Sequence, residues 1–189
     1  MDPGLRMHAE RTPNPNSIKW VIGRSLLEGG ATAQFDAAPS ETVSPLAARL
    51  FAIEGVTRVF LASNFATVTK RDELAWTDLA QPIVDALRRW LAEGAPALGP
   101  QFRPDAEARG GELAARIQRV LDEEVRPRVA MDGGDVVFAG LRGGIVEVYL
   151  HGSCSGCPSS AATLKHGIEA RLREEFPEVE GVVALDPRA

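Results

Sequence analysis

Cysteine is scarce in this sequence. Its only two cysteines, Cys154 and Cys157, both lie in the stretch HGSCSGCPSS, residues 151–160. A pair separated by two residues closes too short a loop to constrain an unfolded chain much, and reducing compartments keep such thiols reduced. The scarcity therefore excludes a fold that is held together by disulfides. We expect the two thiols to have a chemical function instead of a structural one.

Long apolar runs and an excess of positive charge are also missing. No stretch approaches the roughly 20 consecutive apolar residues of a membrane-spanning helix, and the opening MDPGLRMHAER resembles neither a secretory signal nor a transit peptide. The formal net charge is −5, so the chain lacks the basic footprint that nucleic acid requires. We expect a cytoplasmic, bacterial protein that binds neither a membrane nor nucleic acid.

Glycine and proline gather in one stretch of the 189 residues, EGAPALGPQFRPDAEARGG, residues 93–111. Their spacing interrupts every helix or strand that could form there. We therefore predict two tethered α+β domains, with a first domain over residues 1–93, a flexible linker over 94–111 and a second domain over 112–189.

The first domain is predicted to follow the order ββαββα. Runs of β-branched and aromatic residues indicate strands, with turn signals at Gly29-Gly30 and Ser63-Asn64. Ser44 suits a helix N-cap and Pro45 the first helical position. The predicted strands cover residues 17–22, 31–36, 56–62 and 65–70, and the predicted helices cover 45–53 and 76–91.

The second domain is predicted to follow the order αββαβ. An amphipathic helix begins at Glu112 and is expected to stop at Pro127. Two strands flank the turn LRGG, and a helix starting near Pro158 presents an apolar stripe before a last short strand, VEGVVAL. The stripe consists of Leu164, Ile168, Leu172 and Phe176.

The cysteine pair stands between a strand and a helix. Cys157 is placed at the expected N-cap and Cys154 one turn earlier, where orphan N–H groups and the helix dipole favour thiolates. Gly152 and Gly156 let the backbone curl so that both sulfurs face one way. Such a loop suits soft metals and redox chemistry alike.

Zinc and iron–sulfur clusters both take four ligands, whereas one chain supplies two thiolates. The remaining ligands would come from a second copy, from other side chains or from small thiols. His151 and His166 match no known histidine-ligand spacing, so we interpret them as solvated or locally bonded. A pair repeated across a two-fold axis gives four sulfurs around one shared cofactor, which implies a homodimer.

Two alternatives use the same cysteines. A thiol–disulfide oxidoreductase also carries Cys-x-x-Cys after a strand and at a helix start. Here, however, the domain begins with a helix, and proline follows the second cysteine instead of separating the two. A dimer bridged by zinc is the other alternative.

The segment MDGGDV, residues 131–136, pairs glycines with acids. It lacks both the GK[ST] of a P-loop and the dinucleotide fingerprint, so we interpret it as a turn from helix to strand. Asp132 and Asp135 are expected to accept hydrogen bonds from local backbone N–H groups. Lys165 is expected to be a solvated helix position.

The second domain resembles the NifU-like domain of the Nfu family of iron–sulfur cluster scaffold and carrier proteins. The likeness covers nearly all of residues 112–186, including VLDEEVRPRVAMDGGDV, IVEVYLHGSCSGCPSS, TLKHGIEARL and EVEGVVAL. The first domain is similar to the family's N-terminal domain through RTPNPNSIKW, SPLAARLFAIEGVTRVFLASNFATVTK and Trp76.

This resemblance implies a function for each domain. It implies that Cys154 and Cys157 ligate a [4Fe-4S] cluster bridged between two subunits, and that the protein is a carrier, not an enzyme. The cluster would pass to apo iron–sulfur client proteins. The first domain, which has no cysteine, would help to recognise these clients or upstream assembly factors.

Overall fold

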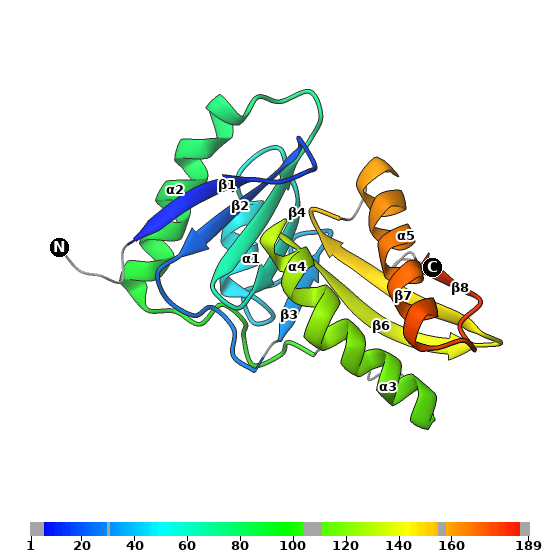
Figure 1. Ribbon diagram of the computed structural model, residues 1–189. Coiled ribbons are helices and arrows are strands. Elements are labelled where there is room, and N and C mark those ends of the chain that lie inside the picture. The colour runs from blue at the N-terminus through cyan, green and yellow to red at the C-terminus, as the bar shows by residue number, and fades with distance from the viewer. Residues whose placement is uncertain (1–5, 30, 104–110, 155–157, 186–189) are drawn as a thin grey trace. The chain divides into compact units, whose positions relative to one another are not determined.

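The chain forms two compact units, Met1–Pro104 and Asp105–Ala189, each with its own buried core (Figure 1). The structure is a computed structural model, and it describes residues 6–29, 31–103, 111–154 and 158–185.

The first unit is an antiparallel sheet of five strands in the order β1-β2-β5-β4-β3, packed against two helices. Alternate strand residues such as Trp20, Leu61 and Val68 pack with Leu50 and Leu87 of the helices in one core. The elements are β1 (Met7–Arg11), β2 (Ser17–Ile22), β3 (Thr32–Phe35), α1 (Pro45–Phe51), β4 (Val56–Ala62), β5 (Phe65–Lys70) and α2 (Trp76–Glu93).

Most predicted elements of this unit are confirmed, including the hairpin of β4 and β5. The side chain of Ser44 caps α1 by accepting the N–H of Ala47 at 3.1 Å. Strand β1 was not predicted. Its residues are exposed or half-buried at the sheet edge, so its pairing with β2 leaves little hydrophobic pattern in the sequence.

The first part of the predicted linker packs against the first unit. Ala97 is 3% exposed, and Leu98 and Phe102 contact the core. The N–H of Gly99 donates to the carbonyl oxygen of Val43 at 2.8 Å. Proline and glycine prevent regular structure here, but they do not prevent an irregular segment from burying its apolar side chains. The unit therefore extends to Pro104, beyond the predicted end at residue 93.

The second unit packs its helices against a three-stranded sheet in the order β6-β7-β8. Strands β6 and β7 are antiparallel, and β7 and β8 are parallel. The predicted apolar stripe is confirmed, because Leu164, Ile168 and Leu172 of α5, and Phe176 directly after its end, all join this core. The elements are α3 (Glu112–Val120), η2 (Leu121–Val125), α4 (Arg126–Met131), β6 (Gly134–Arg142), β7 (Ile145–Gly152), α5 (Pro158–Glu175) and β8 (Gly181–Leu185).

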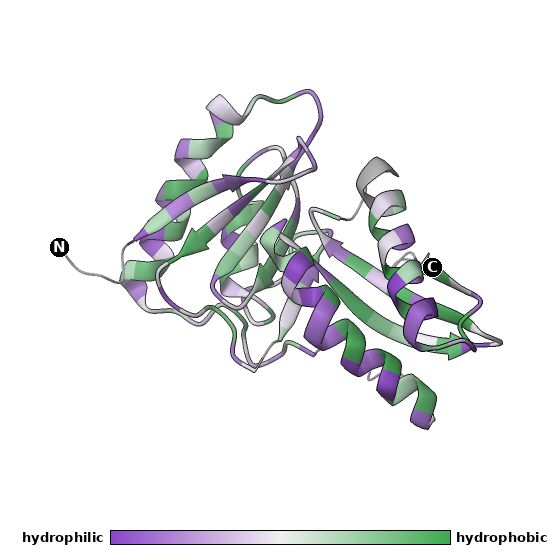
Figure 2. Cartoon of the chain, in the orientation of Figure 1, coloured by the Kyte–Doolittle hydropathy of each residue, from purple (hydrophilic) through white to green (hydrophobic). Residues whose placement is uncertain are grey.

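The first helix of this unit continues past Pro127, so the prediction that it stops there is wrong. Helix α3, whose hydrophobic and hydrophilic residues lie on opposite sides in Figure 2, passes through the π-helical turn η2 into α4. Pro127 stands in the first turn of α4, where a missing N–H is tolerated, directly after the wider turn. The helix thereby reaches Met131, next to the start of β6.

Candidate functional site

Cys154 lies just beyond the end of β7, in the connection to α5. Gly152 adopts a φ of +66°, which turns the chain out of the strand. Cys154 is 7% exposed and joins the core of the second unit. Cys157, the other predicted site residue, lies outside the described residues. The structure therefore describes half of the predicted thiol pair.

A glycine on the neighbouring strand makes room for the Cys154 sulfur. Gly134 pairs with Gly152 in the ladder between β6 and β7. A Cβ atom on Gly134 would lie 2.5 Å from Sγ of Cys154 and 2.9 Å from the carbonyl oxygen of His151. Real Cβ atoms do not approach other atoms so closely, so the sulfur occupies space that any other residue at position 134 would fill.

Ser153 fastens the cysteine loop to the turn between α4 and β6. Its N–H donates to the carbonyl oxygen of Gly133 at 3.1 Å, and its hydroxyl donates to that of Asp132 at 2.5 Å. Ser153 is 1% exposed, and its Oγ lies 3.9 Å from Sγ of Cys154. Sequence reasoning assigned Asp132 a side-chain role, whereas its backbone carbonyl makes the contact with the site.

An ion pair between Arg126 and Asp135 lies at the start of β6, directly after the same turn. Arg126 donates from Nε and Nη2 to the two carboxylate oxygens of Asp135, at 2.8 and 2.9 Å. The hydrogen bonds that Arg126 donates to this carboxylate raise the pKa of its guanidinium. Asp135 also accepts the N–H of Val136 at 2.8 Å, so the predicted contact with local backbone is confirmed. The partnership with Arg126 was not predicted.

Three other polar residues of this unit were considered from the sequence. His166 is exposed on α5, and His151 is 4% exposed with its ring stacked on Tyr149, centroids 6.4 Å apart. Lys165 is half-buried rather than fully solvated. Among the residues that the structure describes, no three His, Cys, Asp or Glu side chains group as metal ligands would.

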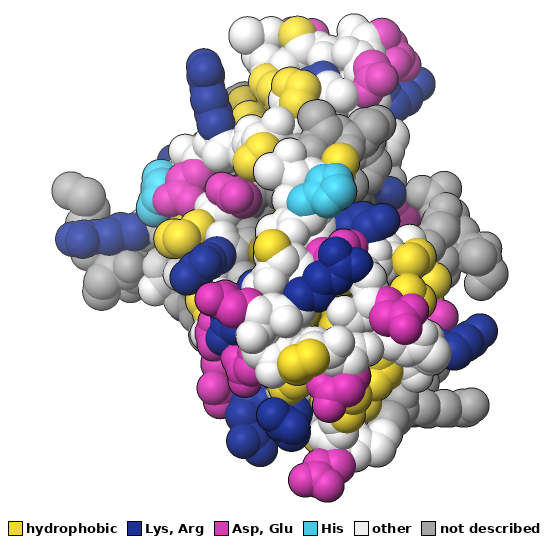
Figure 3. Space-filling model, turned by 45° about the vertical axis from the view of Figure 1, so that its right-hand side comes forward, with side chains coloured by type: hydrophobic (Ala, Val, Ile, Leu, Met, Phe, Trp, Pro, Cys, Tyr) yellow, Lys and Arg dark blue, Asp and Glu magenta, His cyan; other side chains and the backbone are white. Residues whose placement is uncertain are grey.

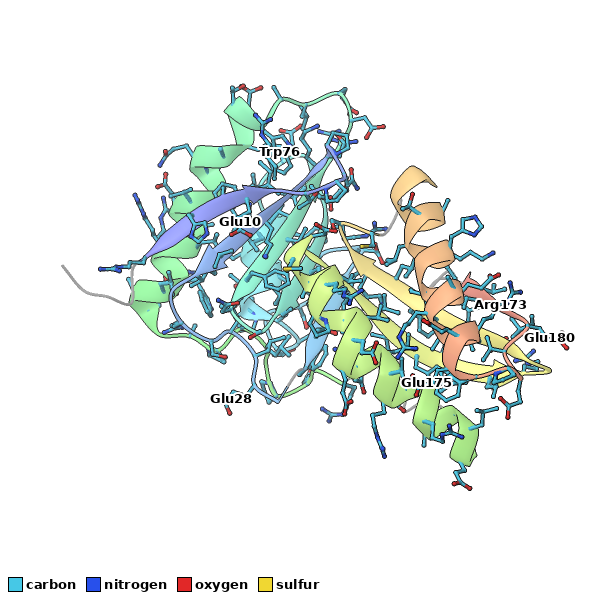
Figure 4. All side chains as sticks on the ribbon, viewed as in Figure 1. Glu10, Glu28, Trp76, Arg173, Glu175 and Glu180 are labelled. Atoms are coloured by element: carbon cyan, nitrogen blue, oxygen red, sulfur yellow. The ribbon has the colours of Figure 1, made fainter. Side chains whose placement is uncertain are left out.

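Ion pairs also fasten α5, the helix that follows the cysteine loop. Arg171 donates from Nε and Nη2 to Glu124 of η2, both at 2.7 Å, and these hydrogen bonds lower the pKa of Glu124. Figure 4 places Arg173, near the end of α5, beside Glu180, whose carbonyl oxygen accepts its hydrogen bond. The helix is thus connected to both η2 and the residue before β8.

The surface charge is mixed. On the face drawn in Figure 3, basic and acidic side chains are interspersed, in keeping with the net charge of −5. No helix in the described part of the chain is both long enough and apolar enough to cross a membrane.

The chemical group of this site is the thiol of Cys154, next to the turn that Ser153 contacts through Asp132 and Gly133. Cysteine sulfur binds soft metals and iron–sulfur clusters, and a cluster with four thiolate ligands needs twice the two cysteines of this chain. The residues fit such a group in donor type, because Cys154 supplies a thiol, whose sulfur lies beside Gly134 while the residue joins the core of the second unit.

Comparison with known proteins assigns both units. The family model described as "Scaffold protein Nfu/NifU N terminal" matches residues 7–94, and that of the "NifU-like domain" matches residues 117–183. A human protein described as "NFU1 iron-sulfur cluster scaffold homolog, mitochondrial" is 43% identical over 93% of this chain and 70% of its own length. The protein of the same description from Drosophila persimilis is 37% identical, over 93% and 64%.

Among solved structures, a NifU-like protein from Saccharomyces cerevisiae, determined by solution NMR, covers 53% of this chain and 89% of its own. Its TM-score is 0.47 at 21% identity. The chain spans less than two thirds of the Drosophila relative's length. With both domain models matched in order, and with 43% identity to a human scaffold homologue, the chain belongs to the Nfu family of iron–sulfur cluster scaffold proteins.

Proposed function

We propose that two copies of this chain hold one [4Fe-4S] cluster as cargo, on the four thiolates of Cys154 and Cys157 from each copy. The observation that carries this proposal is the position of the Cys154 thiol, just after β7 and beside Gly134. Family membership supports the nature of the cargo, and the count of two cysteines per chain supports sharing between two subunits.

The protein acts as a carrier and not as an enzyme. A client thiolate binds an iron as one cysteine of the carrier leaves, so that each Fe–S bond formed replaces one broken. The proton released by the client thiol ends on the departing cysteine, and the iron keeps its oxidation state. Because each subunit supplies only half of the ligands, loosening the dimer opens coordination positions for the client.

The first domain would serve recognition of apo-proteins or upstream assembly factors, since it contains no cysteine. The relatives described as mitochondrial match 93% of the chain, and a bacterial cytoplasmic location for this protein stays a prediction.

The test is cluster retention by the full chain in Cys154→Ala and Cys157→Ala, each reconstituted anaerobically with iron and sulfide. We expect both variants to lose the cluster at unchanged thermal stability. Ser25→Ala is the matched control, because it removes a small polar group from the first unit, where its hydroxyl donates to Leu27. This control should bind as much iron as the original protein.

Normal cluster content in either cysteine variant would contradict the proposal. Efficient reduction of a model disulfide by the metal-free protein would instead support the oxidoreductase alternative. Stoichiometric zinc after anaerobic purification, resistant to exchange for iron and sulfide, would support the zinc-bridged dimer.

A further inference from the structure

The first unit has a cavity of about 510 Å³ between α1 and α2. This volume is in the range of ligand pockets, which combine an apolar lining with a few polar groups. The apolar lining includes Ile53, Pro82 and Ala86. Four charged side chains also line the cavity, and these are Arg49, Asp85, Arg89 and Glu93. All of these residues belong to the first unit, whereas the cysteines lie in the second.

The guanidinium of Arg49 is only partly satisfied in this cavity. Its Nη2 donates to Oε2 of Glu93 at 2.6 Å. Its Nη1 is buried and has no hydrogen-bond partner among the residues that the structure describes. A buried donor without an acceptor is unfavourable, because water has little access to it. A carboxylate that bonds end-on to both terminal nitrogens would therefore satisfy Arg49 better than Glu93 does.

Arg89 adds a second positive charge at the same place. The pKa of Glu93 is lowered by the hydrogen bond from Arg49 and, more weakly, by the charge of Arg89. Arg89 is exposed on α2 and forms no ion pair with any residue in the described part of the chain. Two arginines therefore attract an anion to the position that the Glu93 carboxylate fills.

Glu93 can leave this position at little cost. It is the last residue of α2, and its side chain is 52% exposed. Exposed ion pairs contribute little to stability, so the carboxylate can turn into water. Two cations then face one acid, Asp85, whose carboxylate accepts a hydrogen bond from Gln81 at 2.9 Å. The vacated cavity thus attracts negative charge beside an apolar lining.

We propose that this cavity docks a partner protein through a segment that carries a carboxylate next to an apolar side chain. The carboxylate displaces Glu93 from Arg49 and pairs with Arg89, while the apolar side chain contacts Ile53, Pro82 and Ala86. That this partner is a cluster client or an assembly factor rests on the proposed function. The chemistry of the docking does not depend on a cluster.

The test titrates the isotope-labelled, cluster-free full chain with the peptide acetyl-Glu-Leu-Leu-Glu-amide and follows backbone amide signals by NMR. We expect saturable shifts at the residues that line the cavity. Binding should be about tenfold tighter than for acetyl-Gln-Leu-Leu-Gln-amide, which has the same shape without the charges.

Variants of the cavity should change the affinity in opposite directions. Arg49→Met should weaken peptide binding about tenfold, and Arg89→Gln, at a more exposed position, about threefold. Glu93→Gln should strengthen binding about threefold, because the competing carboxylate is gone. A gain in affinity cannot result from damaged folding. Arg88→Gln is the matched control, because Arg88 is exposed on the same helix outside the lining, and it should bind the peptide normally.

Several results would overturn the proposal. These are equal binding of the acidic and the amide peptide, weaker binding by Glu93→Gln, and a preference for acetyl-Lys-Leu-Leu-Lys-amide. Acetate binding as tightly as the acidic peptide would show an anion site that recognises no apolar side chain, and so no docking of a protein segment. Iron content after reconstitution should be equal in all four variants. A chain that binds the peptide but holds no cluster would refute the proposed function and leave the docking cavity supported.

Discussion

The two units pack helices against a sheet in the same general way but treat their loops differently. In the first unit, side chains close the loops: Trp76, at the start of α2 (Figure 4), donates to the carbonyl oxygen of Pro15 at 3.0 Å, and Lys70 donates to Asn16 at 2.7 Å. In the second unit, the loop after β7 carries the Cys154 thiol beside Gly134. The loop with the candidate ligand therefore depends on a position that has no side chain, whereas these loops of the first unit depend on side-chain hydrogen bonds.

One ion pair from each unit allows a comparison of burial. In the first unit Arg49 pairs with Glu93 at 2.6 Å, and their side chains are 32% and 52% exposed. In the second unit the carboxylate that Arg126 meets, that of Asp135, is only 5% exposed. Surface pairs contribute little to stability, whereas loss of one partner from a buried pair is costly. Removing the cation should therefore destabilise the fold more at Asp135, next to the turn that supports the Cys154 thiol, than at Glu93.

The largest expected effect comes from Trp90→Ala in the core of the first unit. Trp90 is 1% exposed, packs under Arg24 and donates to Pro96. Its removal should lower the free energy of unfolding of that unit by about 3–5 kcal/mol. Denaturant unfolding measures this, and iron content after reconstitution should stay unchanged. If iron content fell together with the free energy of unfolding, iron binding would not belong to the second unit alone.

The next effect is expected from Arg126→Met, which leaves Asp135 buried without its cation. We expect the second unit to lose about 3 kcal/mol. Arg49→Met is the matched control in the first unit, where Glu93 can turn to water, and it should change little. Urea unfolding of both variants compares the two pairs. Equal losses of unfolding free energy in the two variants would show that the deeper burial of Asp135 does not add to the cost.

Gly134→Ala should change the site more than the fold. The added Cβ would meet the Cys154 sulfur, so the loop must shift, at a cost of about 1–3 kcal/mol. Iron retention should fall strongly. Gly111→Ala is the control, because a Cβ there meets no atom within 4 Å. Normal iron binding by Gly134→Ala would contradict the assigned role of this glycine.

The smallest effect concerns acid stability. Hydrogen bonds from Arg171 hold the pKa of Glu124 below its ordinary value near 4.5. The pair therefore stabilises the folded chain above that pH, and this stabilisation is lost as the pH falls through the lowered pKa. Arg171→Met should unfold slightly more easily at neutral pH and match the original protein in acid. A constant difference across the pH range would contradict this linkage.

Sequence pattern predicted the elements that contribute to a core. The hairpin of β4 and β5, the Ser44 cap and the apolar stripe of α5 each leave a local signal, and the structure has all three. Strand β1 gave no such signal, because it pairs through its backbone at an edge. The packing of Ala97 on the first unit also escaped prediction, since it depends on contacts distant in sequence.

The sequence named the cysteines of the candidate site, and their role as ligands stays a prediction, but it did not predict the contacts that support Cys154. Spacing and turn chemistry drew attention to Cys154 and its partner thiol. The contacts of Ser153 with Asp132, and of Arg126 with Asp135, join residues separated by 21 and 9 positions. Both contacts depend on how α4 leads into β6. The position of α4 follows from the π-helical turn η2, which the sequence pattern did not predict.

The most direct test of the central claim is the stoichiometry of the reconstituted protein. Iron and sulfide are quantified against protein after anaerobic reconstitution, and light scattering gives the molar mass against the 20.3 kDa of one chain. The account predicts about four irons and four sulfides per two chains, with the mass doubling on cluster binding. A monomer that retains no iron, and cycles Cys154 and Cys157 between dithiol and disulfide, would contradict it.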